Sequence, residues 1–386
     1  MKLLTPLLVG WTMLFSVGGI AQNIGNVNKI YSPNNKELQR KEIIIPKIGP
    51  YTVLKGDFHI HTMFSDGLVW PTYRIDEAWS DGLDVLAITD HIEYRPYKQY
   101  LPDDLNVSYD IALPRAKELG ITLIKGIEIT RKQGVLGHFN ALFIKDANKI
   151  KIDDAKASIT EAYNQGAYII FNHPGWAVDT CVITPFQDDL LKSGMIKGIE
   201  VINNHEYYPR VLSWSQDMGL TVISASDSHE PIIESYDLLE DNRMAPRFRP
   251  MTLLFVHDKE YAAACALQGE EADAAKQQCI RKSLDNGTTL GYFNGNLAGK
   301  KELLEQFAHS TLAFAKIYSN GKKDFYEISN KCDIPYTLNF LKKTYVINPL
   351  SKISVALPIG VKKLDVKILN MHCYEFSNLG TSFVLP

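Results

Sequence analysis

The chain has 386 residues, of which 45% are hydrophobic and 22% are charged, and its formal net charge is −3. This length and composition are ordinary for a globular protein of one or two domains. The near-neutral charge argues against a general nucleic-acid binder, although a local basic pocket remains compatible with it.

The N-terminus is typical of an export signal. Lys2 precedes an apolar run from Leu3 to Val17, and Gly19-Ile20-Ala21 offers small residues at the usual cleavage position. An uncleaved membrane anchor is the alternative, but the run is short for a bilayer span of about 20 residues. We therefore expect a signal peptide over residues 1–21, a linker over 22–50, and a periplasmic or extracellular protein without a transmembrane span after cleavage.

A repeating pattern of strands and helices begins near Lys55. Short apolar, β-branched runs alternate with longer stretches of helical periodicity. The predicted strands are Gly56–His61, Asp84–Thr89, Thr122–Ile129, His138–Ile144, Ala167–Asn172, Gly198–Ile202 and Thr221–Ala225. The predicted helices are Pro71–Ser80, Ser108–Leu119, Asp154–Gln165, Phe186–Ser193 and Pro209–Met218. This pattern favours a parallel, barrel-like α/β domain, with an open doubly wound sheet as the alternative.

The last third of the chain changes character. Residues 230–250 are rich in Pro, Arg and acidic residues and predict a long loop, after which a helix-rich stretch continues to about Leu312. From Ala313 onward, short β-type runs separated by Asn, Pro and Gly predict a small sandwich-like domain. The predicted boundaries are therefore 51–312 for the barrel with its helical extension and 313–386 for the β-rich domain.

The cysteines receive no chemical role. There are five, an odd number, so at least one is unpaired. Cys265 and Cys279 flank a short helical segment, where a local disulfide and free thiols are both compatible with the sequence.

Histidines and acidic residues gather at the ends of the predicted strands, where the active sites of parallel α/β barrels form. The candidate metal ligands are His59, His61, Asp66, His91, Glu128, His138, His173, Asp227 and His229. Residues two apart on a strand share a face, so His59 and His61 point the same way. Imidazole binds Zn, Mn and Fe well. Each residue alone is more typical of a structural role, but their joint order along the chain predicts a metal site.

Two acidic residues need separate consideration. Glu128 lies in an apolar strand, where an unpaired carboxylate would be costly. It either forms a buried salt bridge, for example with Arg131, or bridges two cations. Asp90 points away from its neighbour His91 in an extended chain, so we expect it to orient another ligand rather than to bind metal itself.

These motifs, HIHTMFSDG, ITDH, GIEIT, GHFNAL, NHPGW and ASDSH, resemble those of the PHP (polymerase and histidinol phosphatase) superfamily from about residue 55 to 230. The resemblance implies a distorted seven-stranded (β/α) TIM-like barrel. The segment after Arg249-Pro250-Met251 and the β-rich tail resemble an exported bacterial subgroup.

The resemblance also implies two to three divalent cations (Zn, Mn or Fe) in adjacent positions. The first would be held by His59, His61, Glu128 and Asp227. Glu128 would bridge to a second cation on His138 and His173, and Asp66, His91 and His229 would hold the third.

Such a site implies hydrolysis of a phosphomonoester or phosphodiester by a metal-bound hydroxide, because clustered cations lower the pKa of water and neutralise phosphoryl oxygens. Asp66 and Glu128 would limit the charge of the site. Arg95 and Arg131 are the best placed to bind the phosphate of a small substrate, with a surface salt bridge as the alternative for each. His205 would line the rim or transfer a proton, with an exposed loop histidine as the alternative. No specific nucleic-acid partner is expected.

Two other functions remain open. An amidohydrolase-type enzyme acting on a C–N or C–O bond also opens with an HxH pair, but it often bridges its metals with a carboxylated lysine, whereas this chain has Glu128. A non-catalytic, metal-stabilised binding module would be expected to have lost ligands, and none is lost here.

Overall fold

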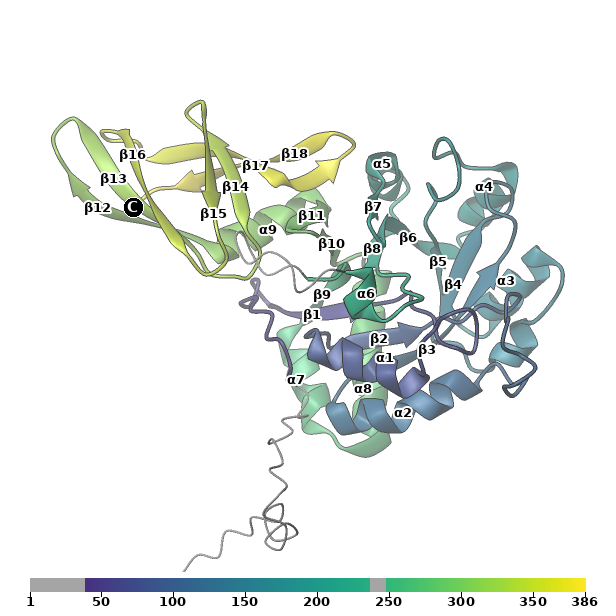
Figure 1. Ribbon diagram of the computed structural model, residues 1–386. Coiled ribbons are helices and arrows are strands. Elements are labelled where there is room, and N and C mark those ends of the chain that lie inside the picture. Colours follow the sequence, from purple (N-terminus) through teal and green to yellow (C-terminus); the bar gives the residue numbers. More distant parts are fainter. Residues whose placement is uncertain (1–38, 237–247) are drawn as a thin grey trace, which may run out of the picture. The chain divides into compact units, whose positions relative to one another are not determined.

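The computed structural model describes residues 39–236 and 248–386 (Figure 1). The predicted signal peptide and most of the predicted linker lie outside the described residues. Among the helices of the described ranges, none has the length and apolar character that a bilayer span requires.

Parallel strands and helices alternate at the start of the described chain. β1 pairs in parallel with β2, and β2 pairs in parallel with β3. Helix α1 begins at Pro71, whose restricted φ suits a first helical turn, and α2 ends at Gly120, which adopts a left-handed φ of 74°. These elements are β1 (Tyr51–Asp57), α1 (Pro71–Ser80), β2 (Val85–Ile88), α2 (Val107–Leu119) and β3 (Thr122–Thr130).

Strand β4 reverses the direction of the chain, whereas the prediction had a parallel sheet. β4 is antiparallel to β3 and β5, while β5, β6 and β8 run parallel. The segment 131–137 between β3 and β4 is too short for a helical crossover, which takes about a dozen residues. The elements are β4 (His138–Leu142), η1 (Ala147–Ile150), α3 (Ala155–Asn164), β5 (Tyr168–Phe171), α4 (Pro185–Lys192), β6 (Ile196–Asn203), β7 (Glu206–Tyr207), α5 (Pro209–Asp217), β8 (Thr221–Ala225) and α6 (Ile232–Ser235).

The stretch predicted as helix-rich contains strands as well as helices. β9 pairs antiparallel with β1 and β10, and β10 pairs with β11. The prediction missed these strands because a short apolar run has no period that separates a buried strand from a buried helix. The elements are β9 (Met251–His257), α7 (Asp258–Ala266), α8 (Gly269–Asp285), β10 (Thr289–Phe293), β11 (Asn296–Gly299) and α9 (Lys301–Thr311). All five cysteines are free, with Cys265 exposed and Cys279 buried.

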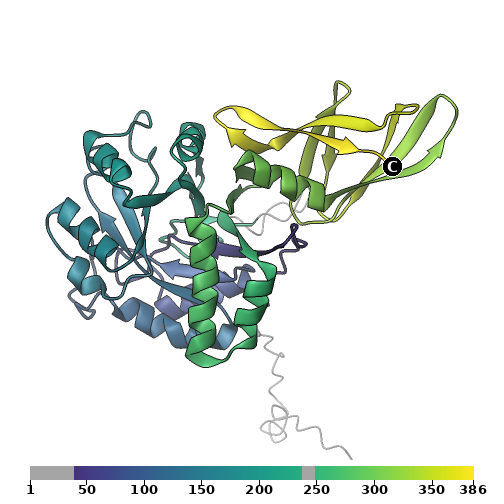
Figure 2. The ribbon, with the colours of Figure 1, turned by 180° about the vertical axis from the view of Figure 1, so that it is seen from behind.

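Side chains from most of these strands meet in one buried cluster. Leu54 of β1, Val85 of β2 and Ile124 of β3 share it with Ile170 of β5 and Ile223 of β8. Helices α7 and α8, which lie in front in Figure 2, contribute to the same cluster. A common interior of this kind is what a barrel-like sheet requires. The protein therefore has a mixed α/β fold with a large, parallel-rich sheet, consistent with a barrel.

Seven strands follow α9. Three of them, β12, β13 and β16, form a separate sheet, whereas β14, β15, β17 and β18 extend the large sheet to fifteen strands. The extension arises because β17 pairs in parallel with β11. The strands are β12 (Leu312–Ser319), β13 (Lys323–Asn330), β14 (Tyr336–Phe340), β15 (Lys343–Ile347), β16 (Lys352–Pro358), β17 (Lys363–Tyr374) and β18 (Ser377–Val384). Hydrogen bonding thus continues across the boundary predicted at residue 313.

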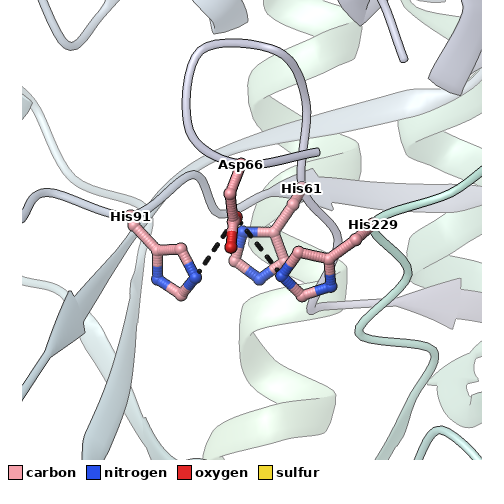
Figure 3. A group of neighbouring side chains, drawn as sticks. All are labelled: His61, Asp66, His91 and His229. Atoms are coloured by element: carbon pink, nitrogen blue, oxygen red, sulfur yellow. Dashed lines mark ion pairs between the residues drawn. The ribbon is translucent and has the colours of Figure 1, made fainter. Parts of the chain in front are cut away.

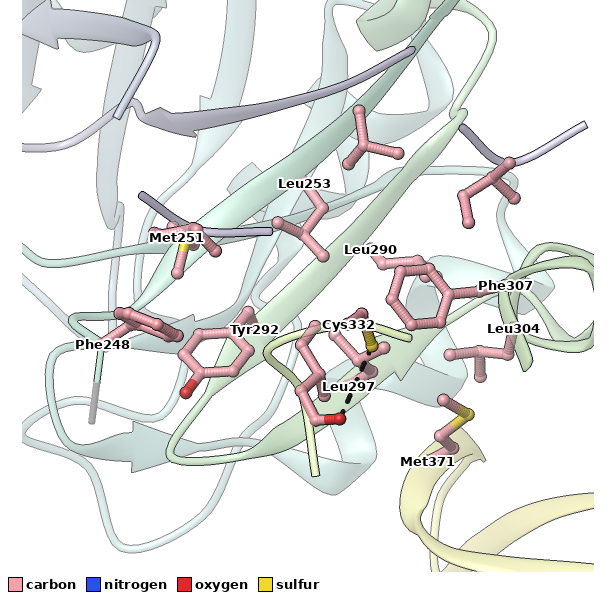
Figure 4. Packing of buried hydrophobic residues seen from close by; sticks show 14 of the residues in the cluster. Phe248, Met251, Leu253, Leu290, Tyr292, Leu297, Leu304, Phe307, Cys332 and Met371 are labelled. Atoms are coloured by element: carbon pink, nitrogen blue, oxygen red, sulfur yellow. Dashed lines mark hydrogen bonds between the residues drawn. The ribbon is translucent and has the colours of Figure 1, made fainter. Parts of the chain in front are cut away.

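Apolar packing accompanies this pairing. Leu290 of β10 and Leu297 of β11 lie in the same cluster as Phe307 of α9 and Met371 of β17 (Figure 4). All four side chains are fully buried. Since burying one such side chain contributes about 1.5–3 kcal/mol, the C-terminal strands are firmly joined to β10 and β11.

Candidate metal centre

The candidate ligands lie at the edge of the sheet where the parallel strands end. His59 and His61 follow β1 directly, rather than lying inside the strand predicted for residues 56–61. Ile60 between them forms a bridge with Ser228, which keeps the segment after β1 beside the segment after β8. His138 starts β4, and because β4 is antiparallel, its first residue lies at the same edge.

Glu128 of β3 lies at the centre of the cluster and is fully buried. Its Oε2 is 2.5 Å from His91 Nδ1, and its Oε1 is 3.3 Å from His138 Nδ1. The same Oε1 is 3.6 Å from His59 Nε2 and 3.7 Å from His173 Nε2. One carboxylate therefore faces imidazoles from four different segments of the chain.

Asp227 joins the segment after β8 to the pair after β1. Its Oδ1 is 3.1 Å from Nε2 of both His59 and His61, and Asn203 Nδ2 donates to its Oδ2 at 3.2 Å. Asp227 and His173 both have a positive φ, of 49° and 26°. Such backbone conformations are costly for non-glycine residues and concentrate at functional sites.

A further group surrounds Asp66 (Figure 3). Asp66 Oδ1 is buried without a hydrogen bond and lies 3.4 Å from His91 Nε2 and 3.3 Å from His229 Nε2. Gly67 lets this loop fold back, since a Cβ there would lie only 2.7 Å from the carbonyl carbon of His61. The loop therefore brings a carboxylate to two imidazoles.

The donor atoms fit divalent cations. They form four overlapping groups, and within each group the ligand atoms lie within 4.8 Å of one another: His61, Asp66, His91 and His229; His59, His173 and Asp227; His59, His61 and Glu128; and Glu128, His138 and His173. Among the described residues, no Lys or Arg forms an ion pair with the three carboxylates. Because buried charges are paired or coordinate metals, and imidazole with carboxylate suits Zn, Mn and Fe, these groups can bind metals.

The pKa values of the cluster reflect its crowding. Burial raises the pKa of Glu128, but the surrounding imidazoles outweigh burial and hold it well below its ordinary value. Burial lowers the pKa of His59, but the neighbouring carboxylates outweigh it and raise the value. Burial and two adjacent imidazoles lower the pKa of His61 to about 3. A cation that binds to this cluster therefore competes with protons for the same side chains.

Glu200 of β6 contacts two of the candidate ligands, although the sequence did not single it out. It is fully buried, and its Oε1 accepts a hydrogen bond from His59 Nδ1 at 2.8 Å. This bond leaves Nε2 of His59 free to face the cluster. Glu200 Oε2 also accepts from the backbone N–H of His173 at 2.7 Å. A signal was present, because Gly198-Ile199-Glu200 repeats the Gly-Ile-Glu that contains Glu128.

Glu200→Gln is expected to weaken metal affinity by about 10- to 100-fold, the usual cost of losing a group that orients a metal-binding histidine. The amide preserves the size of the side chain but accepts the His59 proton less strongly. Metal titration of the purified variant against the wild-type protein measures the effect. Unchanged affinity would show that Glu200 does not orient His59.

Arg74 of α1 was also missed. Its guanidinium is fully buried and uses all five N–H groups. Nε donates to the carbonyl of His61, Nη2 to those of Ser228 and His229, and Nη1 to that of Glu230 and to the Glu77 carboxylate, at distances of 2.8–3.0 Å. Arg74 therefore ties together the backbones of two ligand-bearing segments.

Asp90, which the sequence predicted to orient another ligand, accepts hydrogen bonds from the loop after His61 and, within the described ranges, from no ligand side chain. Its Oδ1 accepts from the backbone N–H of Thr62 at 2.7 Å and from Ser65 Oγ at 2.9 Å. Ser65 Oγ lies 3.3 Å from Nδ1 of His61. Asp90 thus holds the loop that follows His61.

A cavity of about 550 Å³ opens onto the cluster. His205, predicted at the rim, lines this cavity, and its ring lies 4.9 Å from that of Tyr236. The other lining residues are Asp66, His91, Tyr94, Thr130, His138, His173, Trp176, Asn203, Asn204, Glu206, Asp227 and His229. The ligands are thus accessible to a small molecule.

Arg95 and Arg131 are not brought to this cavity. Arg95 is buried and donates to the carbonyls of Phe64 and Pro102 and to Asp103. Arg131 pairs with Glu93 instead of Glu128. Both arginines line a second cavity of about 830 Å³. Their guanidinium groups hold loops together, and neither lies among the metal-binding groups.

Comparisons with known proteins agree with this geometry. A family model described as the PHP domain matches residues 57–237. The crystal structure of a two-domain protein from Bacteroides vulgatus, described as containing a predicted PHP-like metal-dependent phosphoesterase, is 36% identical with a TM-score of 0.81. The match covers 90% of this chain and 100% of that chain.

A curated protein, a 5′-3′ exoribonuclease of Haemophilus influenzae, is 38% identical over 76 residues. That match covers 20% of this chain and only 23% of the length of the relative. The motifs, the site geometry and the full-length structural match agree on one assignment. This chain belongs to the PHP domain family.

Proposed function

We propose that this chain is a metal-dependent hydrolase of phosphate esters, acting on a mono- or diester with two to three divalent cations of Zn, Mn or Fe. The central observation is Glu128, a buried carboxylate that faces imidazoles from four segments beneath an open cavity. Bound cations would neutralise phosphoryl oxygens and lower the pKa of water. The N-terminal sequence supports action outside the cytoplasm.

We assign the ligands as the family resemblance implies, and three of the four groups in the structure support this assignment, whereas Asp227 is grouped with His59 and His173. His59, His61, Glu128 and Asp227 would hold the first cation. Glu128, His138 and His173 would hold the second. Asp66, His91 and His229 would hold the third, with His61 within reach of the same group.

Other residues hold the proposed ligands in position. Glu200 orients His59, and Asn172 Nδ2 donates to Glu128 Oε1 at 2.9 Å, so that the carboxylate keeps one position. His205 lines the cavity without belonging to any of the four metal-binding groups. We assign it the transfer of a proton to the departing oxygen, because it faces the cavity and imidazole is the side chain that most often acts as a general acid or base.

The test is release of phosphate or alcohol from a panel of mono- and diesters, before and after chelation. The panel includes 5′-phosphorylated RNA, because the matched relative from Haemophilus influenzae is an exoribonuclease. We expect turnover that disappears with chelator, returns with Mn, Zn or Fe, and is absent in His59→Ala. Absence of turnover on every ester, with metal bound, would refute the proposal.

A further inference from the structure

Four consecutive residues line the cavity from Asn203 onward, and the last three of them form one wall: Asn204, His205 and Glu206. We call them the site wall. They lie at the tip of the tight hairpin between β6 and β7, which pairs Ile202 with Tyr207. The site wall contains none of the grouped metal ligands. Its position therefore bears on what the cavity accepts rather than on whether cations bind.

Tyr207 follows the site wall directly in the chain and packs against two other rings. Its ring stacks on Phe293 of β10 with centroids 4.8 Å apart and an interplanar angle of 24°. It also lies 5.2 Å from the ring of His372 of β17. The Tyr207 hydroxyl is buried and makes no hydrogen bond. The Tyr207 side chain is thus held by the packing of its ring and not by its hydroxyl. The two rings that it packs against belong to β10 and to the C-terminal strand β17.

His372 is itself held in place. Its Nε2 lies 3.2 Å from Asn296 Oδ1, and its Nδ1 lies 3.4 Å from Asn378 Nδ2 of β18. Residue 372 pairs with Ala298 in the β11–β17 ladder. The His372 ring that contacts Tyr207 is therefore held in place by neighbouring residues of the large sheet.

The hairpin formed by β17 and β18 also contacts α5, the helix that follows β7. Tyr374 Oη donates to Asp217 Oδ2 at 2.9 Å. The backbone N–H of Glu375 donates to Ser213 Oγ at 3.2 Å. β17 and the turn after it thus contact both Tyr207, the residue that follows the site wall, and helix α5.

We propose that the C-terminal strands position the site wall through the packing of Tyr207 against His372 and Phe293, which makes Tyr207 and His372 positioning residues for the substrate's leaving group. The inference rests on the proposed function. The C-terminal strands are then part of the catalytic unit and not an appended module.

The test compares three variants of the full chain loaded with metal. Tyr207→Ala removes the ring, and Tyr207→Phe keeps it while removing a hydroxyl that has no partner. Tyr318→Ala is the matched control, since Tyr318 stacks on Phe325 at 4.3 Å in the separate three-stranded sheet. The readouts are KM and kcat on p-nitrophenyl phosphate and bis(p-nitrophenyl) phosphate, metal content, and amide hydrogen exchange of residues 203–208.

We expect Tyr207→Ala to raise KM several-fold to about tenfold, the order that loss of an aromatic pair produces, with metal content within about twofold. On these two esters kcat should also stay within about twofold, because p-nitrophenolate leaves without a proton from His205. Exchange of residues 203–208 should rise in this variant and stay at the wild-type rate in Tyr207→Phe and Tyr318→Ala. His372→Ala should act in the same direction if Tyr207→Ala does not fold.

If both Tyr207→Ala and His372→Ala keep the wild-type KM and the wild-type rate of amide exchange, the inference is wrong. The hydrolase proposal would remain intact. If the wild-type protein turns over neither ester, the exchange measurement alone decides. Faster exchange in Tyr207→Ala, but not in Tyr318→Ala, then supports the positioning role, and equal exchange overturns it.

Discussion

Glu128→Gln is expected to remove turnover and to lower metal content. Glu128 belongs to two of the four ligand groups, and glutamine keeps its size while removing the negative charge. Changing a group that only orients a ligand costs about 10- to 100-fold, so loss of a shared ligand should cost at least roughly 100-fold in kcat/KM. Elemental analysis of the purified variant and kinetics on the preferred ester measure both effects.

Glu118→Gln on the exposed side of α2 is the control for this substitution, because the Glu118 side chain is 66% exposed and belongs to none of the ligand groups. It should behave like the wild-type protein. Full metal content and full turnover in Glu128→Gln would show that the central carboxylate is not a ligand.

Arg74→Met is expected to lower the free energy of unfolding by about 3–5 kcal/mol, because removing one partner of a buried, hydrogen-bonded charge leaves the other unpaired. Four backbone carbonyls and the Glu77 carboxylate would each lose one hydrogen-bond donor. The bridge between Ile60 and Ser228 would still keep the segments after β1 and β8 side by side, but they would be held less firmly, so binding at Asp66, His91 and His229 should weaken as well. Urea unfolding and metal titration measure the two effects.

Arg115→Met on α2 provides the comparison. Arg115 pairs with Asp76 and Glu118, but its side chain is 25% exposed. A partly exposed ion pair contributes about 0–1 kcal/mol, so this variant should unfold almost as the wild-type protein does. Equal destabilisation of the two variants would contradict the role assigned to Arg74.

Local sequence patterns were sufficient to predict the bounds of some helices and strands. Helix α1 has the predicted bounds, Pro71–Ser80, and β8 has the predicted bounds, Thr221–Ala225. Proline at a first turn and glycine after a last turn act within a few residues, so the sequence shows them directly. The candidate ligands were visible for a similar reason, since each lies in a short motif at a strand end and the order of the motifs was enough to predict a shared site.

By itself, the sequence determined the alternation of strands and helices, the set of candidate ligands and the family resemblance. Only the tertiary structure decided which distant residues meet. Glu200 reaches His59 across 141 positions, and Arg74 reaches Ser228 across 154. It also decided that β4 is antiparallel, that Arg95 and Arg131 lie away from the metal-binding groups, and that β17 pairs with β11. Periodicity reports which face of an element is buried, whereas such contacts depend on strand order and register, which no local pattern contains.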